Sequence, residues 1–269
     1  MKRILLAIAF FIGVTHFQFS PALAKTGGGP KPDINLVFIG NSITAGATLQ
    51  DARMQAPPIV ARALVAEATG LTTNVYNGGH SGITTYGFLP GRNDFAKVTN
   101  AAKTFVKDNG GPVYFSIMLG TNDSACTTTE GAPVSPDTYM QNLRKIIEGV
   151  IEAVPDCRIL LNYPIWYSPN THNSAKYLQE GLDRLHSYYP VIDRIVADYP
   201  QVYAGNRDVW DYFKDKRTLF TEERGNSGNF FLHPNVDGAQ HLAAIWAKSL
   251  LTLIKADGIK VRKHHARRK

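Results

Sequence analysis

The stretch "INLVFIGNSITAG" (residues 34–46) joins an apolar run, interrupted only by Asn35, to a glycine, an asparagine and a serine. An apolar run without polar alternation is typical of a strand that is buried on both faces of a parallel sheet. Gly40 permits a tight turn, and Ser42 then stands where the strand should give way to a helix. A serine in this place is often only a helix N-cap, so the stretch predicts a βα unit and leaves the role of Ser42 open.

The rest of the chain repeats this alternation of apolar strands and helical segments. Further strands are expected at 72–79, 111–120 and 157–164 and, short, at 201–206, with helices within 54–69, around 94–108, at 136–154, roughly 174–199 and 235–254. Strands that alternate with helices predict parallel βαβ units, here in one α/β domain over residues 34–257. In such a sheet, ligand sites form at the carboxyl ends of the strands.

The N-terminal segment has the features of a secretory signal. Residues 1–24 combine a basic start, a short apolar stretch and a small-residue cleavage pattern that ends at Ala24. Residues 25–33, rich in Gly and Pro, are then a flexible lead. We therefore expect a secreted or periplasmic protein whose mature chain has no transmembrane span.

The formal net charge of +7 is concentrated at the C-terminus. The last ten residues carry six Lys or Arg and no acid, which predicts a basic tail over residues 258–269. Without these six charges and those of Lys2 and Arg3, the remaining chain carries −1. A body so close to neutral gives no basis for a nucleic-acid partner.

Two cysteines fall at opposite ends of the predicted sheet. Cys126 follows the third strand, whereas Cys157 begins the fourth. A five-residue strand already spans ~17 Å, and a disulfide needs Cα atoms within about 7 Å of each other. The positions therefore predict two free thiols. No group of Cys and His has the spacing of a zinc site, and we expect neither a metal nor another cofactor.

Glycine or polar residues follow successive strands. After the second strand, "NGGHSG" (77–82) lets backbone N–H groups approach a ligand, and after the third, "GTND" (120–123) presents Asn122. His233 precedes the last helix. Each signal alone fits an ordinary turn or cap. Together with Ser42, they supply a nucleophile, oxyanion donors and a base, which is the set that acyl transfer through a serine ester requires.

In order and spacing, these segments resemble the four blocks of the SGNH hydrolases, also called GDSL-type esterases. The matching segments "GNSIT", "NGGHSG", "GTND" and "LHPN" span most of the chain, residues 40–238. The resemblance implies a flavodoxin-like, three-layer α/β/α sandwich around about five parallel strands, without a metal. It also implies that Ser42 is the nucleophile and His233 the base, with an oxyanion hole formed by Ser42, Gly82 and Asn122.

The chain departs from the family's pattern just before His233. Phe230 stands where the family usually has an aspartate, and a phenyl ring accepts no hydrogen bond from imidazole. Some other acceptor must then select the histidine tautomer that leaves Nε2 free to act as a base. We favour a neutral acceptor, a backbone carbonyl or the side chain of Asn229. The alternative is a displaced carboxylate, for which the candidates are Asp208, Asp211, Glu222 and Glu223.

Aromatic residues after the fourth strand bear on the substrate. Tyr163, Trp166 and Tyr167 could rim the cleft and stack on a sugar ring, or equally could pack inside a loop. With the secretory signal, they favour a small acyl group, acetyl, removed from a carbohydrate ester. The substrate would be an acylated small molecule or polysaccharide. A lysophospholipase or short-chain lipase is the alternative, followed by a non-catalytic glycan-binding relative. The oligomeric state stays open.

Overall fold

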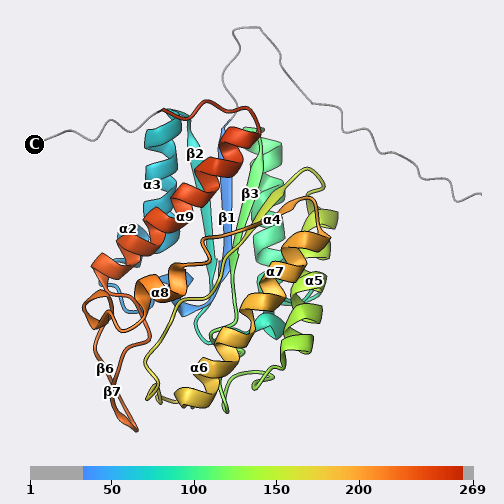
Figure 1. The fold of residues 1–269 in the computed structure, drawn as a ribbon. Coiled ribbons are helices and arrows are strands. Elements are labelled where there is room, and N and C mark those ends of the chain that lie inside the picture. Colours follow the sequence, from blue (N-terminus) through green and yellow to red (C-terminus); the bar gives the residue numbers. More distant parts are fainter. Residues whose placement is uncertain (1–32, 263–269) are drawn as a thin grey trace, which may run out of the picture. The chain divides into compact units, whose positions relative to one another are not determined.

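The structure, a computed structural model, describes residues 33–262. The signal expected at 1–24, nearly all of the expected lead and tail residues 263–269 lie outside this range. The described chain is built around a five-stranded parallel sheet in the order β2-β1-β3-β4-β5 (Figure 1). The strands are β1 (Ile34–Gly40), β2 (Thr73–Gly79), β3 (Val113–Met118), β4 (Arg158–Leu161) and β5 (Val202–Ala204).

Apolar strand composition explains the centre of this sheet. Every residue of β1 and β3 is buried, as their largely apolar runs predict. The register aligns Gly40 at the end of β1 with Gly79 of β2 and with Met118 of β3. The segments that follow these three strands therefore leave the sheet at the same edge.

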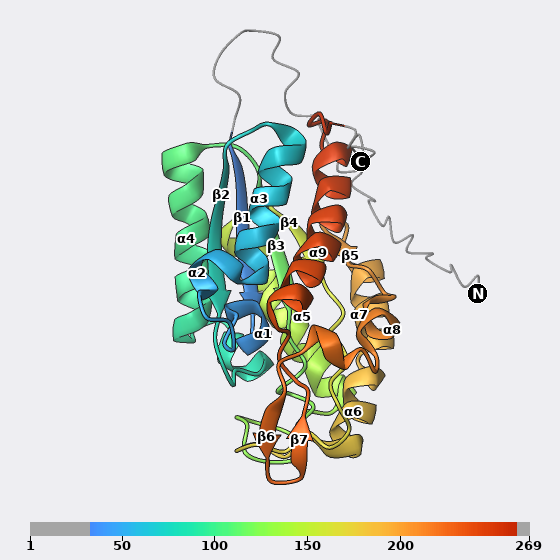
Figure 2. The same cartoon turned by 90° about the vertical axis from the view of Figure 1, so that its left-hand side faces the viewer.

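Helices cover both faces and give three layers. Helices α3 and α9 pack against each other on one face, and α4, α5 and α7 lie on the other (Figures 1 and 2). The helices are α1 (Ser42–Ala45), α2 (Ala52–Gln55), α3 (Pro57–Thr69), α4 (Asn93–Asn109), α5 (Pro136–Ala153), α6 (Leu178–Ser187), α7 (Tyr189–Asp198), α8 (Val209–Phe213) and α9 (Val236–Ala256). The α/β class and the three-layer, five-stranded architecture are thus confirmed.

Helix α9 is fixed at its start and along its buried face. The side chain of Asn235 caps it by accepting a hydrogen bond from the N–H of Gly238 at 3.0 Å. Further along, Trp246 stacks on Phe38 of β1 with ring centroids 5.6 Å apart. The residues just before α9, His233 among them, are consequently held against the sheet.

Two local features differ from the expectation. The helical region expected at 174–199 is divided into α6 and α7, because Pro190 in the first turn of α7 lacks the N–H that a continuous helix needs. A small antiparallel hairpin, β6 (Glu223–Gly225) and β7 (Gly228–Phe230), precedes α9. Its strands of three residues are too short to show a period in the sequence.

Cys126 and Cys157 are both free, as predicted. Within residues 33–262, no helix is long and apolar enough to cross a membrane. In the same range, no group of three or more His, Cys, Asp or Glu side chains is placed to hold a metal ion.

Candidate active site

Ser42 is the first residue of α1, directly after the end of β1. The preceding Asn41 caps this short helix, and its side-chain oxygen accepts a hydrogen bond from the N–H of Ile43 at 3.0 Å. Asn41 therefore supplies the N-cap of α1. The alternative that Ser42 is only a helix N-cap does not hold. The Ser42 hydroxyl is left available for another partner.

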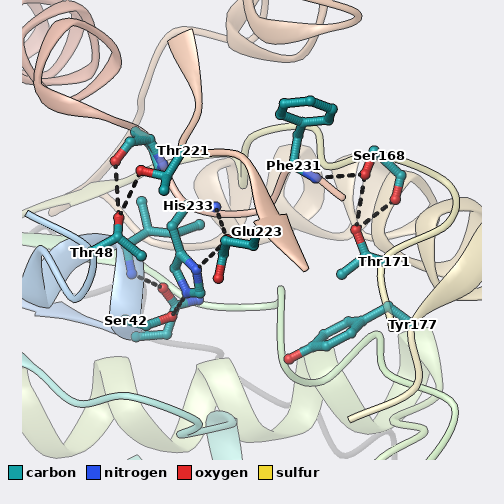
Figure 3. A network of polar contacts seen from close by, with 12 residues as sticks. Ser42, Thr48, Ser168, Thr171, Tyr177, Thr221, Glu223, Phe231 and His233 are labelled. Carbon is teal, nitrogen blue, oxygen red and sulfur yellow. Dashed lines mark hydrogen bonds and ion pairs between the residues drawn. The ribbon is translucent and has the colours of Figure 1, made fainter. Parts of the chain in front are cut away.

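That partner is His233. Its Nε2 lies 2.8 Å from the Oγ of Ser42, so the serine hydroxyl can donate to the imidazole (Figure 3). The backbone around the histidine is fixed as well, because the carbonyl oxygen of His233 accepts from the N–H of Thr221 at 2.9 Å. The structure therefore brings together two residues that are 191 positions apart in the sequence.

A carboxylate holds the other side of the ring. Oε1 of Glu223 lies 2.8 Å from Nδ1 of His233 and 3.3 Å from the N–H of the same residue. Both side chains are largely buried, with 12% of the histidine and 20% of the glutamate exposed. With Nδ1–H donating to Glu223, Nε2 is free to accept the proton of Ser42.

The hairpin explains how Glu223 reaches this position. Glu223 on β6 pairs directly with Phe230 on β7, the residue that replaces the family's usual aspartate. Side chains of directly opposed residues in an antiparallel pair lie on the same face. The carboxylate has therefore moved to the neighbouring strand, while Phe230 is buried in the core.

The neutral acceptor that we favoured from the sequence is not what the structure shows. The side chain of Asn229 donates to the carboxylate of Glu222, and neither residue bonds to His233. Asn229 is exposed and forms a pair with Arg224 in the hairpin. Of the four acidic alternatives, Glu223 alone contacts the imidazole, because its strand runs past the ring.

The expected oxyanion donors lie in the segments that follow β2 and β3, which leave the sheet at the same edge as Ser42. Asn122 is buried, and its Nδ2 donates to the carbonyl oxygen of Ile83 at 2.8 Å. Gly82 directly precedes Ile83 and has φ of +79°, a conformation that other residues rarely adopt. No heavy atom lies within 4 Å of the place where a side chain at Gly82 would begin, so this backbone is open to an incoming ligand.

Two buried residues beside Asn122 were not predicted. Tyr177 donates its hydroxyl to the Oδ1 of Asn122 at 2.7 Å. Asp123 accepts from the N–H of Thr85 at 2.9 Å and also from the Thr85 hydroxyl. The sequence offers a weak signal for Asp123, its place in "GTND", and none for Tyr177.

The aromatic rim is a wrong expectation. Tyr163, Trp166 and Tyr167 are only 2%, 3% and 1% exposed and cannot stack on a sugar. Trp166 packs edge-on against Phe220, and the Tyr167 hydroxyl lies 3.0 Å from that of Ser124. The structure supports the alternative, in which these three side chains pack inside the loop.

A serine, an imidazole and a carboxylate in line at the carboxyl edge of a parallel α/β sheet form the arrangement of a serine hydrolase. The sequence profile of the GDSL-like Lipase/Acylhydrolase family matches residues 38–241. The chain belongs to this family and is a carboxylic ester hydrolase. No curated protein matches the chain.

Solved structures share the fold at low sequence identity. An acetylxylan esterase from Geobacillus stearothermophilus is 21% identical with a TM-score of 0.55, over 88% of this chain and 99% of that one. A carbohydrate acetylesterase from Sinorhizobium meliloti is 15% identical with a TM-score of 0.56, over 81% and 99%. A family 3 carbohydrate esterase from Talaromyces cellulolyticus is 16% identical with a TM-score of 0.55, over 83% and 99%. At these identities, the similarities establish that the chain shares the fold of these enzymes.

Proposed function

We propose that this protein is a serine esterase that removes a small acyl group, acetyl, from a carbohydrate ester. The observation that carries the proposal is the unbroken series of hydrogen bonds from Glu223 through His233 to Ser42. Ser42 follows β1 at the edge of the sheet where the segments that carry Gly82 and Asn122 follow β2 and β3. Nucleophile, base and oxyanion donors therefore share one edge of the sheet.

Acylation follows from this geometry. Nε2 of His233 takes the proton of Ser42 as Oγ attacks the ester carbonyl carbon. The carbonyl oxygen becomes an oxyanion, and the N–H groups of Ser42 and Gly82 and the Asn122 amide donate to it. When the intermediate collapses, the imidazolium returns its proton to the departing alcohol, and Glu223 stabilises the charge on the ring meanwhile.

In deacylation, a water molecule takes the place of the Ser42 hydroxyl as the nucleophile. His233 removes a proton from a water molecule, which attacks the acyl-serine carbonyl through a second oxyanion. Collapse of this intermediate restores the Ser42 hydroxyl with the proton held by His233, and the carboxylic acid leaves. Acyl-enzyme chemistry of this kind splits one difficult step into two easier ones.

The choice of a small acyl group does not rest on a cavity. The hollow that borders Ser42 and His233 is too tight to admit even a water molecule, so it gives no information on the length of the acyl chain. The acetylesterases among the structural neighbours favour this choice, whereas the buried aromatic residues no longer contribute to it. Export, suggested by residues 1–24, is part of the proposal and agrees with a polymeric substrate.

The test compares matched variants on esters of increasing chain length. Purified protein is assayed with p-nitrophenyl acetate, butyrate and octanoate, then with acetylated xylan. We expect the acetate to be preferred and Ser42→Ala to abolish turnover, while Ser187→Ala, a control at an exposed serine on α6, keeps it. A preference for the octanoate ester would contradict the acetylesterase proposal and favour a lipase. Glycan binding without turnover of any ester would favour a non-catalytic binding module.

The carboxylate is tested in the same assay. Glu223→Gln should lower kcat by about 10³–10⁴, because an amide can hold the ring in the wrong tautomer and does not stabilise the imidazolium. Glu222→Gln is the matched control, since Glu222 bonds to Asn229 and not to the histidine, and its activity should stay within about twofold, as for surface changes in general. Equal effects of the two substitutions would remove Glu223 from the mechanism.

A further inference from the structure

Asn122 is held at both ends of its side-chain amide. Oδ1 accepts the hydroxyl of Tyr177 at 2.7 Å, and Nδ2 donates to the carbonyl oxygen of Ile83 at 2.8 Å. An amide nitrogen carries two hydrogens, so one remains for an oxyanion after Ile83 has taken the other. The tyrosine therefore occupies the end of Asn122 that does not face a substrate oxyanion.

Tyr177 is itself fixed in place. Its ring packs edge-on against Tyr167 with centroids 5.5 Å apart, and it is almost completely buried. Its N–H donates to the carbonyl of Thr171, and its own carbonyl accepts the thiol of Cys126. The hydroxyl is thus presented from a rigid segment, and Figure 3 shows it directed toward the part of the site that holds Ser42.

The hydroxyl can act only as a donor toward Asn122. Burial, with smaller contributions from the charges of Glu223 and Asp123, raises the pKa of Tyr177 well above its usual value, so the group stays protonated. A tyrosine has one O–H hydrogen, and Asn122 takes it. The hydroxyl consequently has no hydrogen left to donate to a substrate.

We propose that Tyr177 is a positioning residue that fixes the Asn122 amide with one N–H aimed at the oxyanion. This inference rests on the proposed esterase function and assigns the loop between β4 and α6 a part in it. Oxyanion donors are effective because they are oriented before the reaction begins. A donor that is free to rotate must be ordered in the transition state, and the cost of this ordering appears in kcat.

The first experiment removes the hydroxyl alone. Tyr177→Phe should lower kcat about fivefold, which corresponds to the ~1 kcal/mol of a typical hydrogen bond. KM should stay nearly unchanged, because the hydrogen bond acts through Asn122 on the oxyanion of the transition state. Tyr189→Phe is the matched control: it removes an equally buried hydroxyl that donates to the carbonyl of Pro164 at 2.8 Å. Equal kinetic effects of the two changes would show a general packing role and overturn the proposal.

The second experiment asks whether Tyr177 acts through Asn122. Asn122→Ala should cost about 10²–10³ in kcat. In that background, Tyr177→Phe should cost nothing further, because there is no amide left to orient. If the two losses multiply instead, Tyr177 contacts the substrate or acts on another group, and the proposal fails.

If the phenylalanine variant folds poorly, two unnatural side chains at position 177 test the same hydrogen bond. At position 177, 4-aminophenylalanine keeps a donor in the place of the hydroxyl, whereas 4-methylphenylalanine fills the same space without one. The amino form should retain most of the wild-type kcat and the methyl form should resemble phenylalanine; equal activity of the two would overturn the proposal. Inactivity of the wild-type protein on every ester would contradict the esterase function itself, whereas an active wild type with unaffected Tyr177 variants contradicts only this inference.

Discussion

The carboxyl group of Asp123 lies entirely inside the protein, and Asp123 directly follows Asn122, the proposed oxyanion donor. One oxygen accepts both hydrogen bonds of Thr85, and the other has no partner among the described residues. Burial raises the pKa of this carboxyl to about 6, although the bonds from Thr85 act in the opposite direction. Because Thr85 follows Gly82 by three residues, Asp123 ties the open backbone of the site to the end of β3.

Asp123→Asn should remove a pH dependence of stability. The unfolded carboxyl ionises near its ordinary pKa of 3.8, whereas the folded one stays protonated up to about 6. Between these values the folded state binds more protons, so the contribution of this group to stability is lost as the pH rises. The loss is about 2–3 kcal/mol at ~1.4 kcal/mol per pKa unit, and asparagine does not titrate. Urea unfolding of both proteins from pH 4 to pH 7 measures it; a difference between them that stays constant with pH would contradict the prediction.

The elements differ in how far the sequence could predict them. The run at 34–40 defines β1 to the residue, because five of its seven positions are apolar and all seven are buried. The buried polar side chain of Asn35 donates to the carbonyl oxygen of Gly110. Four residues could be placed because each lies within four residues of the end of a strand or the start of a helix: Ser42, Gly82, Asn122 and His233. Glu223 could only be offered among four acidic candidates. Its position depends on a hairpin pairing across strands of three residues, and such pairing has no local signal.

Gly225 tests whether the hairpin positions the catalytic carboxylate. A methyl group on Gly225 would lie 2.2 Å from the carbonyl oxygen of His172 and 2.9 Å from the ring of Phe230, so β6 must shift to admit it. Gly225→Ala should therefore lower kcat about tenfold or more, since small misplacements of catalytic groups have large effects on rate. The loss is measured as kcat on p-nitrophenyl acetate, with protein whose circular dichroism spectrum shows that it is folded.

Gly228, at the other end of the same hairpin turn, is the control. It has φ of +89° and no heavy atom within 4 Å of the methyl position, so Gly228→Ala costs backbone strain of ~1–2 kcal/mol without a clash. We expect this variant to be less stable but nearly as active as the wild type. Equal losses of activity in both variants would mean that the hairpin tolerates no change at all and would remove the special role of Gly225.

At the scale of the whole molecule, the parallel sheet places the catalytic residues at one edge and Cys157 at the opposite edge. The catalytic residues meet at the carboxyl edge, where β1, β2 and β3 end together. Cys157 precedes β4 at the opposite edge and is completely buried, whereas Cys126 is partly exposed in the loop after β3. The sequence could predict this separation because strand direction alone decides which residues share an edge. It could not predict how deeply each thiol is buried, because that depends on the helices packed above it.

Cys157 should therefore report on the unfolding of the whole domain. Burial raises the pKa of its thiol to about 12, so the reactive thiolate is scarce and no reagent reaches it in the folded state. In a Cys126→Ser variant, labelling with a thiol reagent should be silent at neutral pH and should appear in urea with the same midpoint as the loss of helix signal. Full unfolding without a reductant should release two thiols from the wild-type protein, consistent with the absence of a disulfide between them. Labelling of Cys157 well below the unfolding midpoint would show that the amino edge of the sheet opens by itself, which the complete burial of Cys157 argues against.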